Sequence, residues 1–240
     1  MKLLSVGVDS KTIKGEKIGF LTGILYLAPS TMAGHGINTC ASASPGCRHT
    51  CLFTAGRAMC FPTINKARIR KTRALFADRK AFLAQLAADI RALIRQASRK
   101  GLTPCVRVNG TSDLLWLAQA MARMFPTVQL YDYTKHPRPW ERVLPNYYLT
   151  FSLSECNENE ALEALIHGIN VSIPFNTRKG EALPSHWRGY PVIDGDVSDV
   201  RHLDPRGVVV GLRAKGRARK DTSGFVRNAQ LVQIQNQIAA

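Results

Sequence analysis

Acidic residues are scarce in this sequence. Its 240 residues include 17 aspartates and glutamates against 33 lysines and arginines, which gives a formal net charge of +16 at pH 7. Such an excess favours a polyanionic partner, most often nucleic acid, and a basic surface that binds nothing specific is the alternative. Hydrophobic residues make up 45% and charged residues 21%, so the composition excludes a disordered chain and indicates a globular one.

Long apolar runs are also absent. No stretch reaches the roughly 18 consecutive apolar residues that a membrane-spanning helix needs, so we expect no membrane span. The amino terminus turns polar at Asp9, Ser10, Lys11 and Lys14 and lacks the apolar segment of a signal peptide. We therefore expect the protein to lie in the cytoplasm.

Repeats, low-complexity tracts and clear linkers are missing, so we interpret residues 1–240 as a single α/β domain, a length that can bury a large core. Strand patterns cover residues 17–28, 105–108, 128–133, 147–153, 171–174, 191–194 and 207–212. Helical patterns cover residues 65–100, 114–125 and 158–167, with a break at Asp78 that could cap a second helix. This alternation predicts mostly parallel strands in a partial, open βα barrel, because the later connections have few helices.

Four of the six cysteines lie close together in the chain. Cys40, Cys47, Cys51 and Cys60 fall within 21 residues, in a cysteine loop of residues 39–60, and the first three have the spacing Cys-x6-Cys-x3-Cys. In a reducing compartment such clustering indicates metal ligation or catalysis before disulfides. The loop follows the first predicted strand, and a βα barrel places its active site at the carboxyl ends of its strands.

Three thiolates from one loop predict an iron–sulfur site. Cys40, Cys47 and Cys51 can hold three irons of a [4Fe-4S] cluster and leave the fourth iron open to an external ligand. The Ser-Pro-Gly turn before Cys47 suits a tight backbone whose amides could bond to cluster sulfurs. The cysteine loop is therefore the strongest functional signal in the sequence.

Alternatives stay open for these cysteines. Cys60 could bind the fourth iron, which would close the cluster and favour a structural or electron-transfer role. Structural zinc is a second alternative, although the paired Cys-x2-Cys spacings typical of zinc sites are absent. Free thiols without a metal are a third. We interpret His35 and His49, which flank the loop, as surface or packing residues.

Polar residues follow most of the predicted strands. If the strand ends surround one mouth, these side chains could bind a small zwitterionic cofactor with a ribose. Asn109 or Thr111 could instead cap the next helix, and Asp132 should point to the opposite face from Tyr131 and Tyr133. The predicted cofactor-binding residues are Asn109, Ser112, Asp113, Asp132, Thr134, Lys135, Ser152, Ser154 and Arg213.

Several stretches resemble the phage-associated family called gene product 88. The resemblance lies in Lys-Thr-Ile-Lys-Gly-Glu-Lys, in Leu-Thr-Gly-Ile-Leu-Tyr-Leu-Ala-Pro, in the loop Thr-Cys-Ala-Ser-Ala-Ser-Pro-Gly-Cys-Arg-His-Thr-Cys-Leu-Phe-Thr-Ala-Gly-Arg and in Val-Arg-Val-Asn-Gly-Thr-Ser-Asp. It spans about residues 11–225. The resemblance implies a phage-encoded protein in the host cytoplasm, but it does not imply any particular activity.

The Cys-x6-Cys spacing with Ser-Pro-Gly before the second cysteine is also similar to the loop of phage proteins related to radical-SAM enzymes. Those loops close with Cys-x2-Cys, and the common radical-SAM pattern is Cys-x3-Cys-x2-Cys, whereas this chain has Cys-x3-Cys. The similarity implies a radical-SAM-like partial barrel, a cluster after the first strand and reductive cleavage of S-adenosylmethionine.

These observations predict a radical-SAM-like iron–sulfur enzyme that acts on a nucleic acid or nucleotide. A second hypothesis is a non-enzymatic, basic nucleic-acid-binding phage protein with a structural cluster or zinc. A third is a metal-free interaction protein. No catalytic residue is predicted.

Overall fold

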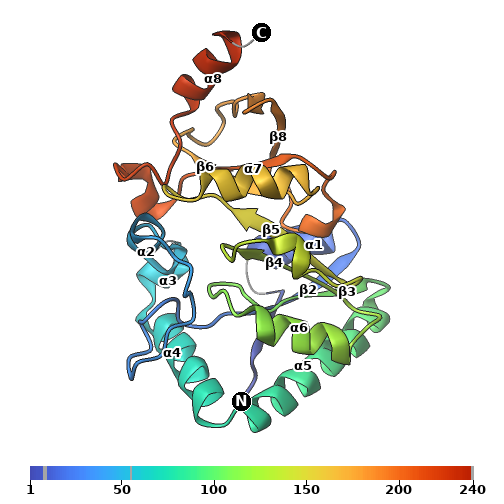
Figure 1. Cartoon of the computed structure of the whole chain (residues 1–240). Helices are drawn as coiled ribbons and strands as arrows, with labels where there is room; N and C mark the ends of the chain where they lie inside the picture. The colour runs from blue at the N-terminus through green and yellow to red at the C-terminus, as the bar shows by residue number, and fades with distance from the viewer. Residues whose placement is uncertain (8–9, 55, 239–240) are drawn as a thin grey trace.

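The computed structural model of this chain describes residues 1–7, 10–54 and 56–238 (Figure 1). Within these residues one sheet contains nine strands, in the order β1-β2-β3-β4-β5-β6-β9-β8-β7. The strands are β1 (Leu4–Val6), β2 (Phe20–Leu25), β3 (Thr103–Arg107), β4 (Gln129–Thr134), β5 (Tyr147–Ser152), β6 (Val171–Phe175), β7 (His186–Trp187), β8 (Tyr190–Asp194) and β9 (Val209–Arg213).

The sheet is mostly parallel and open. Neighbouring strands from β2 to β6, and then β9 and β8, run parallel, whereas β1 and β7 pair antiparallel at the two ends. This confirms the predicted α/β class and the mostly parallel, open sheet. Its closer description as part of a radical-SAM-like barrel stays a prediction.

The α-helices are α1 (Ser10–Glu16), α2 (Pro45–His49), α3 (Arg57–Cys60), α4 (Pro62–Ala77), α5 (Arg79–Lys100), α6 (Leu115–Met124), α7 (Glu158–Ile166) and α8 (Ala229–Ile238). Short 3-10 helices are η1 (Leu52–Thr54), η2 (Pro139–Glu141), η3 (Arg201–Leu203) and η4 (Gly216–Lys220). None of the helices in the described residues combines the length and the apolar character needed to cross a membrane.

The predicted break in the helical stretch at Asp78 is confirmed. Asp78 accepts a hydrogen bond from the Ala81 amide at 2.9 Å and so caps α5. Gly101 ends α5 in the left-handed conformation, with φ of 65°, which favours glycine. Helix α1 was not predicted, because its sequence Ser-Lys-Thr-Ile-Lys-Gly-Glu carries no apolar stripe.

Helices α5, α6 and α7 cover one face of the sheet (Figure 1). Alternate strand residues point to this side, and Leu21, Val106 and Leu149 pack there in one core with Leu86 and Ile90 of α5. A second core continues the same face around α7. Burial of these apolar side chains holds the helices on the sheet.

The opposite face, which we call the cavity face, carries more polar side chains. Thr22 and Cys105 lie 3.2 Å apart there, and α1 approaches Thr22 so closely that a Cβ on Gly15 would lie 3.1 Å from its hydroxyl. The ring of His202 in η3 lies 5.1 Å from that of Phe20. Helix α1 and η3 thus cover this face near the start of β2, and the carboxyl ends of the strands are left to line a cavity.

Candidate functional site

A cavity of about 360 Å³ lies at the carboxyl ends of the parallel strands. Cys40, Cys47 and Cys51 all line it, together with residues at or after the ends of β3, β4, β5, β6 and β9. Its volume falls in the range of small-molecule sites. The structure therefore brings the three predicted cluster ligands to one cavity at the edge of the sheet that the sequence indicated.

Hydrogen bonds fix the start of the cysteine loop against the sheet. The Thr39 hydroxyl donates to the Ala28 carbonyl at 2.6 Å, and the Asp113 amide donates to the Thr39 carbonyl at 2.8 Å. Cys40 Sγ lies 3.9 Å from the carbonyl oxygen of Thr111. Cys40 is thereby held beside the segment that follows β3.

Helix α2 explains the Cys-x3-Cys spacing. Ser44 caps it, since its Oγ accepts from the Cys47 amide at 3.2 Å, and Pro45 stands at the first helical position. Residues four apart lie on the same side of a helix. Cys47 lies in α2 and Cys51 follows its C-cap Thr50, and both line the cavity wall.

Glu155, just after β5, anchors the start of α2. Its carboxylate accepts from Ser44 Oγ at 2.7 Å and from the Gly46 amide at 2.7 Å. Burial raises the pKa of Glu155, but these hydrogen bonds outweigh it and leave the pKa below its usual range. The Gly46 amide is therefore bonded to Glu155, which corrects the expectation that this turn directs its amides at cluster sulfurs.

A side chain at position 46 would displace its neighbours. A Cβ there would lie 2.5 Å from Ser223 Oγ and 2.8 Å from Glu155 Oε2. These neighbours come from segments far away in the sequence. The close approach of three chain segments thus sets the position of α2 and of the cysteines that it carries.

Burial dominates the acidity of the thiols. It raises the pKa of Cys40 to about 11, with further upward contributions from Asp113 and Cys51. It also raises the pKa of Cys51, where Cys47 adds to the increase and the cations Arg68 and Lys135 oppose it. The three thiols are thus close enough to influence one another, and without a metal Cys40 and Cys51 are neutral at pH 7.

Metal ions and clusters require different sets of ligand side chains. Among the described residues, no group of three or more histidine, cysteine, aspartate or glutamate side chains is placed to hold a metal ion. Zinc needs its ligands at about 2.0–2.3 Å from one centre. A cluster binds each cysteine through a different iron.

The remaining cysteines lie elsewhere. Cys60 is exposed in α3 and does not line the cavity, so the structure does not place it as a fourth ligand. Cys156 is exposed and lies 3.6 Å from the Ser154 hydroxyl. Cys105 is buried within β3, and burial raises its pKa to about 12. His35 and His49 are exposed and lie outside the wall, as interpreted from the sequence.

Most of the predicted cofactor-binding residues line the cavity, and two do not. Asp132 points to the helix-covered face, where it accepts from the Asn109 amide at 2.8 Å and from Tyr147 at 3.2 Å, so it supports the core instead. Ser154 is buried, and its amide donates to Asn157 in a local turn. Those in the wall are Asn109, Ser112, Asp113, Thr134, Lys135, Ser152 and Arg213.

Asn109 is committed to local structure. Its Oδ1 accepts from Ser112 Oγ at 2.9 Å and from the Leu114 amide at 2.9 Å, and its Nδ2 donates to Asp132 at 3.0 Å. These bonds order the turn that leads into α6. Asn109, and through it Ser112, therefore supports this turn, but it does not cap α6, whose N-cap is Leu114 without a side-chain capping bond.

Asp113 and Lys135 each have a polar group at the cavity that lacks a hydrogen-bonding or ion-pair partner among the described residues. Asp113 Oδ2 accepts from the Lys135 amide at 2.8 Å, whereas its Oδ1 is buried and makes no hydrogen bond within the described part of the chain. Burial raises the pKa of Asp113. The Lys135 ammonium lies 5.4 Å from the centre of the Phe225 ring and has no carboxylate partner in the described ranges. A buried group without a partner is uncommon and indicates a ligand or water.

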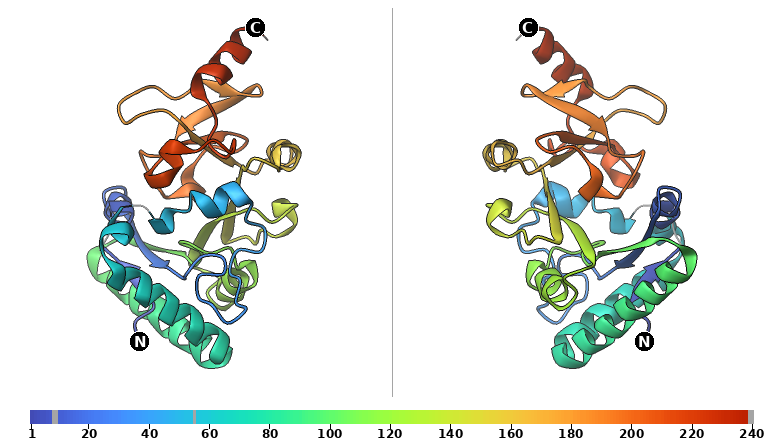
Figure 2. Two further views of the ribbon diagram at one scale, coloured as in Figure 1. Left: turned by 90° about the vertical axis from the view of Figure 1, so that its left-hand side faces the viewer. Right: turned by 90° about the vertical axis from the view of Figure 1, so that its right-hand side faces the viewer.

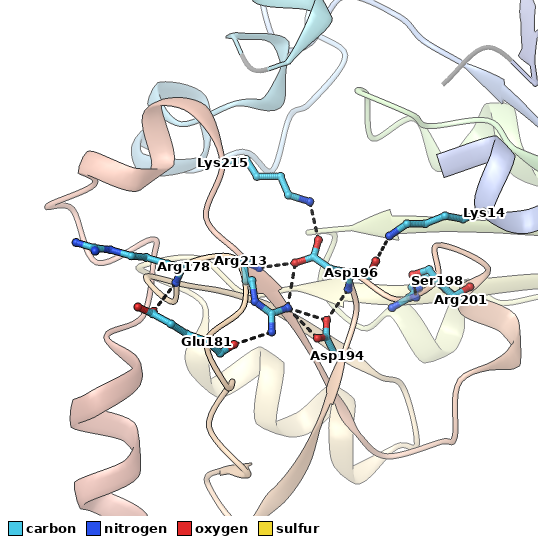
Figure 3. A network of polar contacts seen from close by, with 9 residues as sticks. All are labelled: Lys14, Arg178, Glu181, Asp194, Asp196, Ser198, Arg201, Arg213 and Lys215. Atoms are coloured by element: carbon cyan, nitrogen blue, oxygen red, sulfur yellow. Dashed lines mark hydrogen bonds and ion pairs between the residues drawn. The ribbon is translucent and has the colours of Figure 1, made fainter. Parts of the chain in front are cut away.

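A polar network forms another part of the wall (Figure 3). Arg213 bonds to Asp194 at 2.8 Å and to Asp196 at 3.4 Å, and Lys215 bonds to Asp196 at 2.6 Å. Lys14 of α1 donates to the backbone carbonyl of Asp196. Because two carboxylates hold Arg213, it ties the loop after β8 to the end of β9, and it is less available to a ligand than the sequence suggested.

Arg107 and Asp199 line the cavity and were missed by the sequence reasoning. Their side chains are 6% and 9% exposed and form an ion pair of 3.0 Å. The Arg107 guanidinium also lies 4.7 Å from the centre of the Tyr133 ring. The available signal was an arginine inside the apolar strand sequence Val-Arg-Val, because a charged residue in a buried strand needs a partner.

The fold and the site define an α/β protein with a cysteine-lined cavity at the carboxyl edge of a mostly parallel sheet. The chain belongs to the family described as Gene product 88, whose model matches residues 2–229. No curated protein and no solved structure matches it. The family resemblance seen in the sequence is confirmed, whereas the comparisons give no support to the radical-SAM resemblance.

Proposed function

We propose that this protein is an iron–sulfur protein whose cluster is held by Cys40, Cys47 and Cys51, and that it acts as a radical-SAM-like enzyme on a nucleic acid or nucleotide. The observation that carries the proposal is the position of all three cysteines on one cavity beside the uncommitted groups of Asp113 and Lys135. Cysteine is the usual ligand of such clusters. When bound, the cluster would supply one-electron chemistry.

Nearby cations support thiolate ligation. Arg68 and Lys135 both favour the charged form of Cys51, although burial works in the opposite direction. Ligand thiols must lose their protons, so cations beside them lower the cost of loading the site.

The groups next to the cysteines match a small zwitterion. Asp113 Oδ1 can accept from an ammonium group or a ribose hydroxyl, and the Lys135 ammonium can bind a carboxylate or a phosphate. Ser152 and Ser172 add hydroxyls to the wall, 3.2 Å apart. S-adenosylmethionine carries an ammonium, a carboxylate and a ribose, so it is the cofactor that we propose for this part of the cavity.

Metal analysis of protein purified and reconstituted without oxygen tests the cluster. We expect about four irons and four sulfides per chain, with the absorption of a [4Fe-4S] cluster. The variant C40S/C47S/C51S should lose both, whereas Cys60→Ser and Cys156→Ser should retain them because neither side chain lines the cavity. A folded wild-type protein that stays free of iron would contradict the proposal.

The electron paramagnetic resonance spectrum of the reduced protein tests cofactor binding. S-adenosylmethionine should change this spectrum in the wild type, and Asp113→Asn and Lys135→Ala should weaken the change while the iron content is kept. A cluster that is present but unaffected by S-adenosylmethionine would favour the second hypothesis, in which a structural cluster supports a basic nucleic-acid-binding protein.

A further inference from the structure

Two groups of basic residues lie at opposite ends of the parallel strands. One group lies on the second half of α5, at Arg91, Arg95, Arg99 and Lys100, and α5 leads directly into the first residues of β3. This group is therefore near the amino ends of the parallel strands, away from the cavity. Figure 2 shows α4 and α5 at one end of the molecule and the chain's carboxyl terminus at the other.

The second group lies on η4, at the cavity. Ala218 in the middle of η4 is buried and lines the cavity wall, whereas Arg217, Arg219 and Lys220 are exposed. Helix η4 also packs against η1, which follows Cys51 directly. The basic turn and the cysteine loop thus form one rim, with carboxyl-terminal and amino-terminal segments side by side (Figure 1).

The carboxylates near this rim are bonded to groups other than Arg217 and Lys220. Asp196 is bonded to Arg213 and Lys215. Asp221, next to η4, accepts hydrogen bonds from Ser223 and from the Val226 amide in a local turn. For Arg217 and Lys220 no carboxylate partner exists within residues 1–7, 10–54 and 56–238. Arg217 and Lys220 are therefore not held in ion pairs within these ranges. Asp221 next to them stays ionised, because burial raises its pKa less than its hydrogen bonds lower it.

We infer that single-stranded nucleic acid runs across η4 and places one nucleotide in the cavity. This inference rests on the proposed function for its substrate class. Free cations continue beyond the cavity at Arg217 and Lys220, so they suit a chain of phosphates better than a single phosphate. A base inside a duplex cannot reach a reacting group, whereas a single strand can insert one base into a pocket.

Phe225 supplies an aromatic surface inside the wall. Its ring lines the cavity and has the Lys135 ammonium 5.4 Å from its centre. Bases of single strands stack on such rings, and cations beside the ring bind the backbone. Phe225 therefore offers a stacking surface for one base in the wall of the cavity.

Fluorescence anisotropy with labelled fifteen-residue oligo-dT and oligo-U tests the rim. The variant R217E/K220E should bind roughly tenfold more weakly at moderate salt, and the slope of log affinity against log salt should shrink by about 1.4, the value for two lost phosphate contacts. The matched control is R95E/R99E, which makes the same charge change on α5. It should stay within about twofold of the wild type.

Three results would overturn the inference. One is an equal loss of affinity in both double variants, because binding would then follow net charge alone. Another is the absence of oligonucleotide binding by the wild type at low salt. Equally strong binding of a free nucleotide would assign the site to a small molecule and would also contradict it. Circular dichroism must show that each variant is folded.

Phe225→Ala tests the stacking contact separately. It should weaken oligonucleotide binding roughly tenfold and leave the salt slope unchanged, since stacking involves no counterion release. Phe76→Ala, which removes an exposed ring at the far end of α4, is the control and should have no effect. If Phe225→Ala binds the oligonucleotide as tightly as the wild type, the nucleotide does not stack on Phe225 in the cavity.

The same samples separate this inference from the cluster assignment. Iron content should be normal in R217E/K220E and Phe225→Ala. C40S/C47S/C51S, if folded, should still bind the oligonucleotide through η4. If wild-type protein binds the oligonucleotide but contains no iron, the cluster proposal is wrong and the nucleic-acid inference stands. If wild-type protein contains the cluster but does not bind the oligonucleotide, the nucleic-acid inference is wrong and the cluster proposal stands.

Discussion

Asp132 is a fully buried carboxyl group in the core between β3 and β5. It receives hydrogen bonds from the amide and the side chain of Asn109 and from the Tyr147 hydroxyl. Burial raises its pKa to about 7, although these hydrogen bonds and Arg107 act against the increase. The native state therefore binds a proton at Asp132 that the unfolded chain releases at lower pH.

Stability should fall as the pH rises through this range. Because the folded pKa of about 7 exceeds the unfolded value of 3.8, the contribution of Asp132 is fully present below pH 3.8 and is lost as the pH rises to about 7. The slope is at most about 1.4 kcal/mol per pH unit. Denaturant unfolding of Asp132→Asn should show a flatter pH profile than the wild type.

Asp78→Asn is the matched control for this change. It replaces an exposed carboxyl at the cap of α5 with a residue that caps equally well, so its pH profile should follow the wild type. An Asp132→Asn profile as steep as that of the wild type would mean that other groups cause the pH dependence.

Helix α2 shows how a short element is held by a distant one. Its five residues are too few to form a stable helix by themselves. The Glu155 carboxylate bonds to Ser44 and to the Gly46 amide at its start, where the helix dipole also favours a negative charge. The positions of Cys47 and Cys51 therefore depend on a residue after β5.

Glu155→Ala should loosen the cysteine loop. Because this carboxylate is partly exposed and its bonds exchange with water, we expect a loss of about 1 kcal/mol in the free energy of unfolding. Iron retention during anaerobic gel filtration should fall as well. Glu163→Ala, on the exposed side of α7, should change neither. Full iron retention in Glu155→Ala would mean that the loop holds its shape without this anchor.

The whole molecule carries a large excess of positive charge. With a net charge of +16, repulsion between cations opposes the compact state, and ion pairs such as Lys100–Glu16 and Arg188–Glu158 involve only part of the basic residues. Salt screens exposed charges over about 8–10 Å. Repulsion between unpaired cations should therefore weaken as salt is added.

Salt should raise the melting temperature of the protein. We expect an increase of about 2–5 °C between roughly 20 and 300 mM sodium chloride, measured by scanning calorimetry, because screening relieves more repulsion than attraction. R95E/R99E should show a smaller increase, since it lowers the net charge. A melting temperature that falls with salt would indicate that attractive surface pairs outweigh the repulsion.

Local patterns predicted much of the fold. The apolar stripe and the stop at Gly101 located α5, and the strand segments from Cys105 onward agree with β3 to β6, β8 and β9 within a few residues. Elements without such a pattern were missed, such as α1 and the two-residue β7. They form because neighbouring segments cover them, and a single sequence does not reveal those neighbours.

The sequence by itself determined the chemistry that could gather at the site. The spacing of Cys40, Cys47 and Cys51 follows from one loop and one helical turn, and the strand order placed this loop at the carboxyl edge of the sheet. The tertiary structure decided which groups are available there. The Glu155 carboxylate accepts a hydrogen bond from the Gly46 amide, 109 residues away in the chain. Asp199 forms an ion pair with Arg107, which is 92 residues away. Burial and charge pairing arise between distant segments, so only the folded chain fixes them.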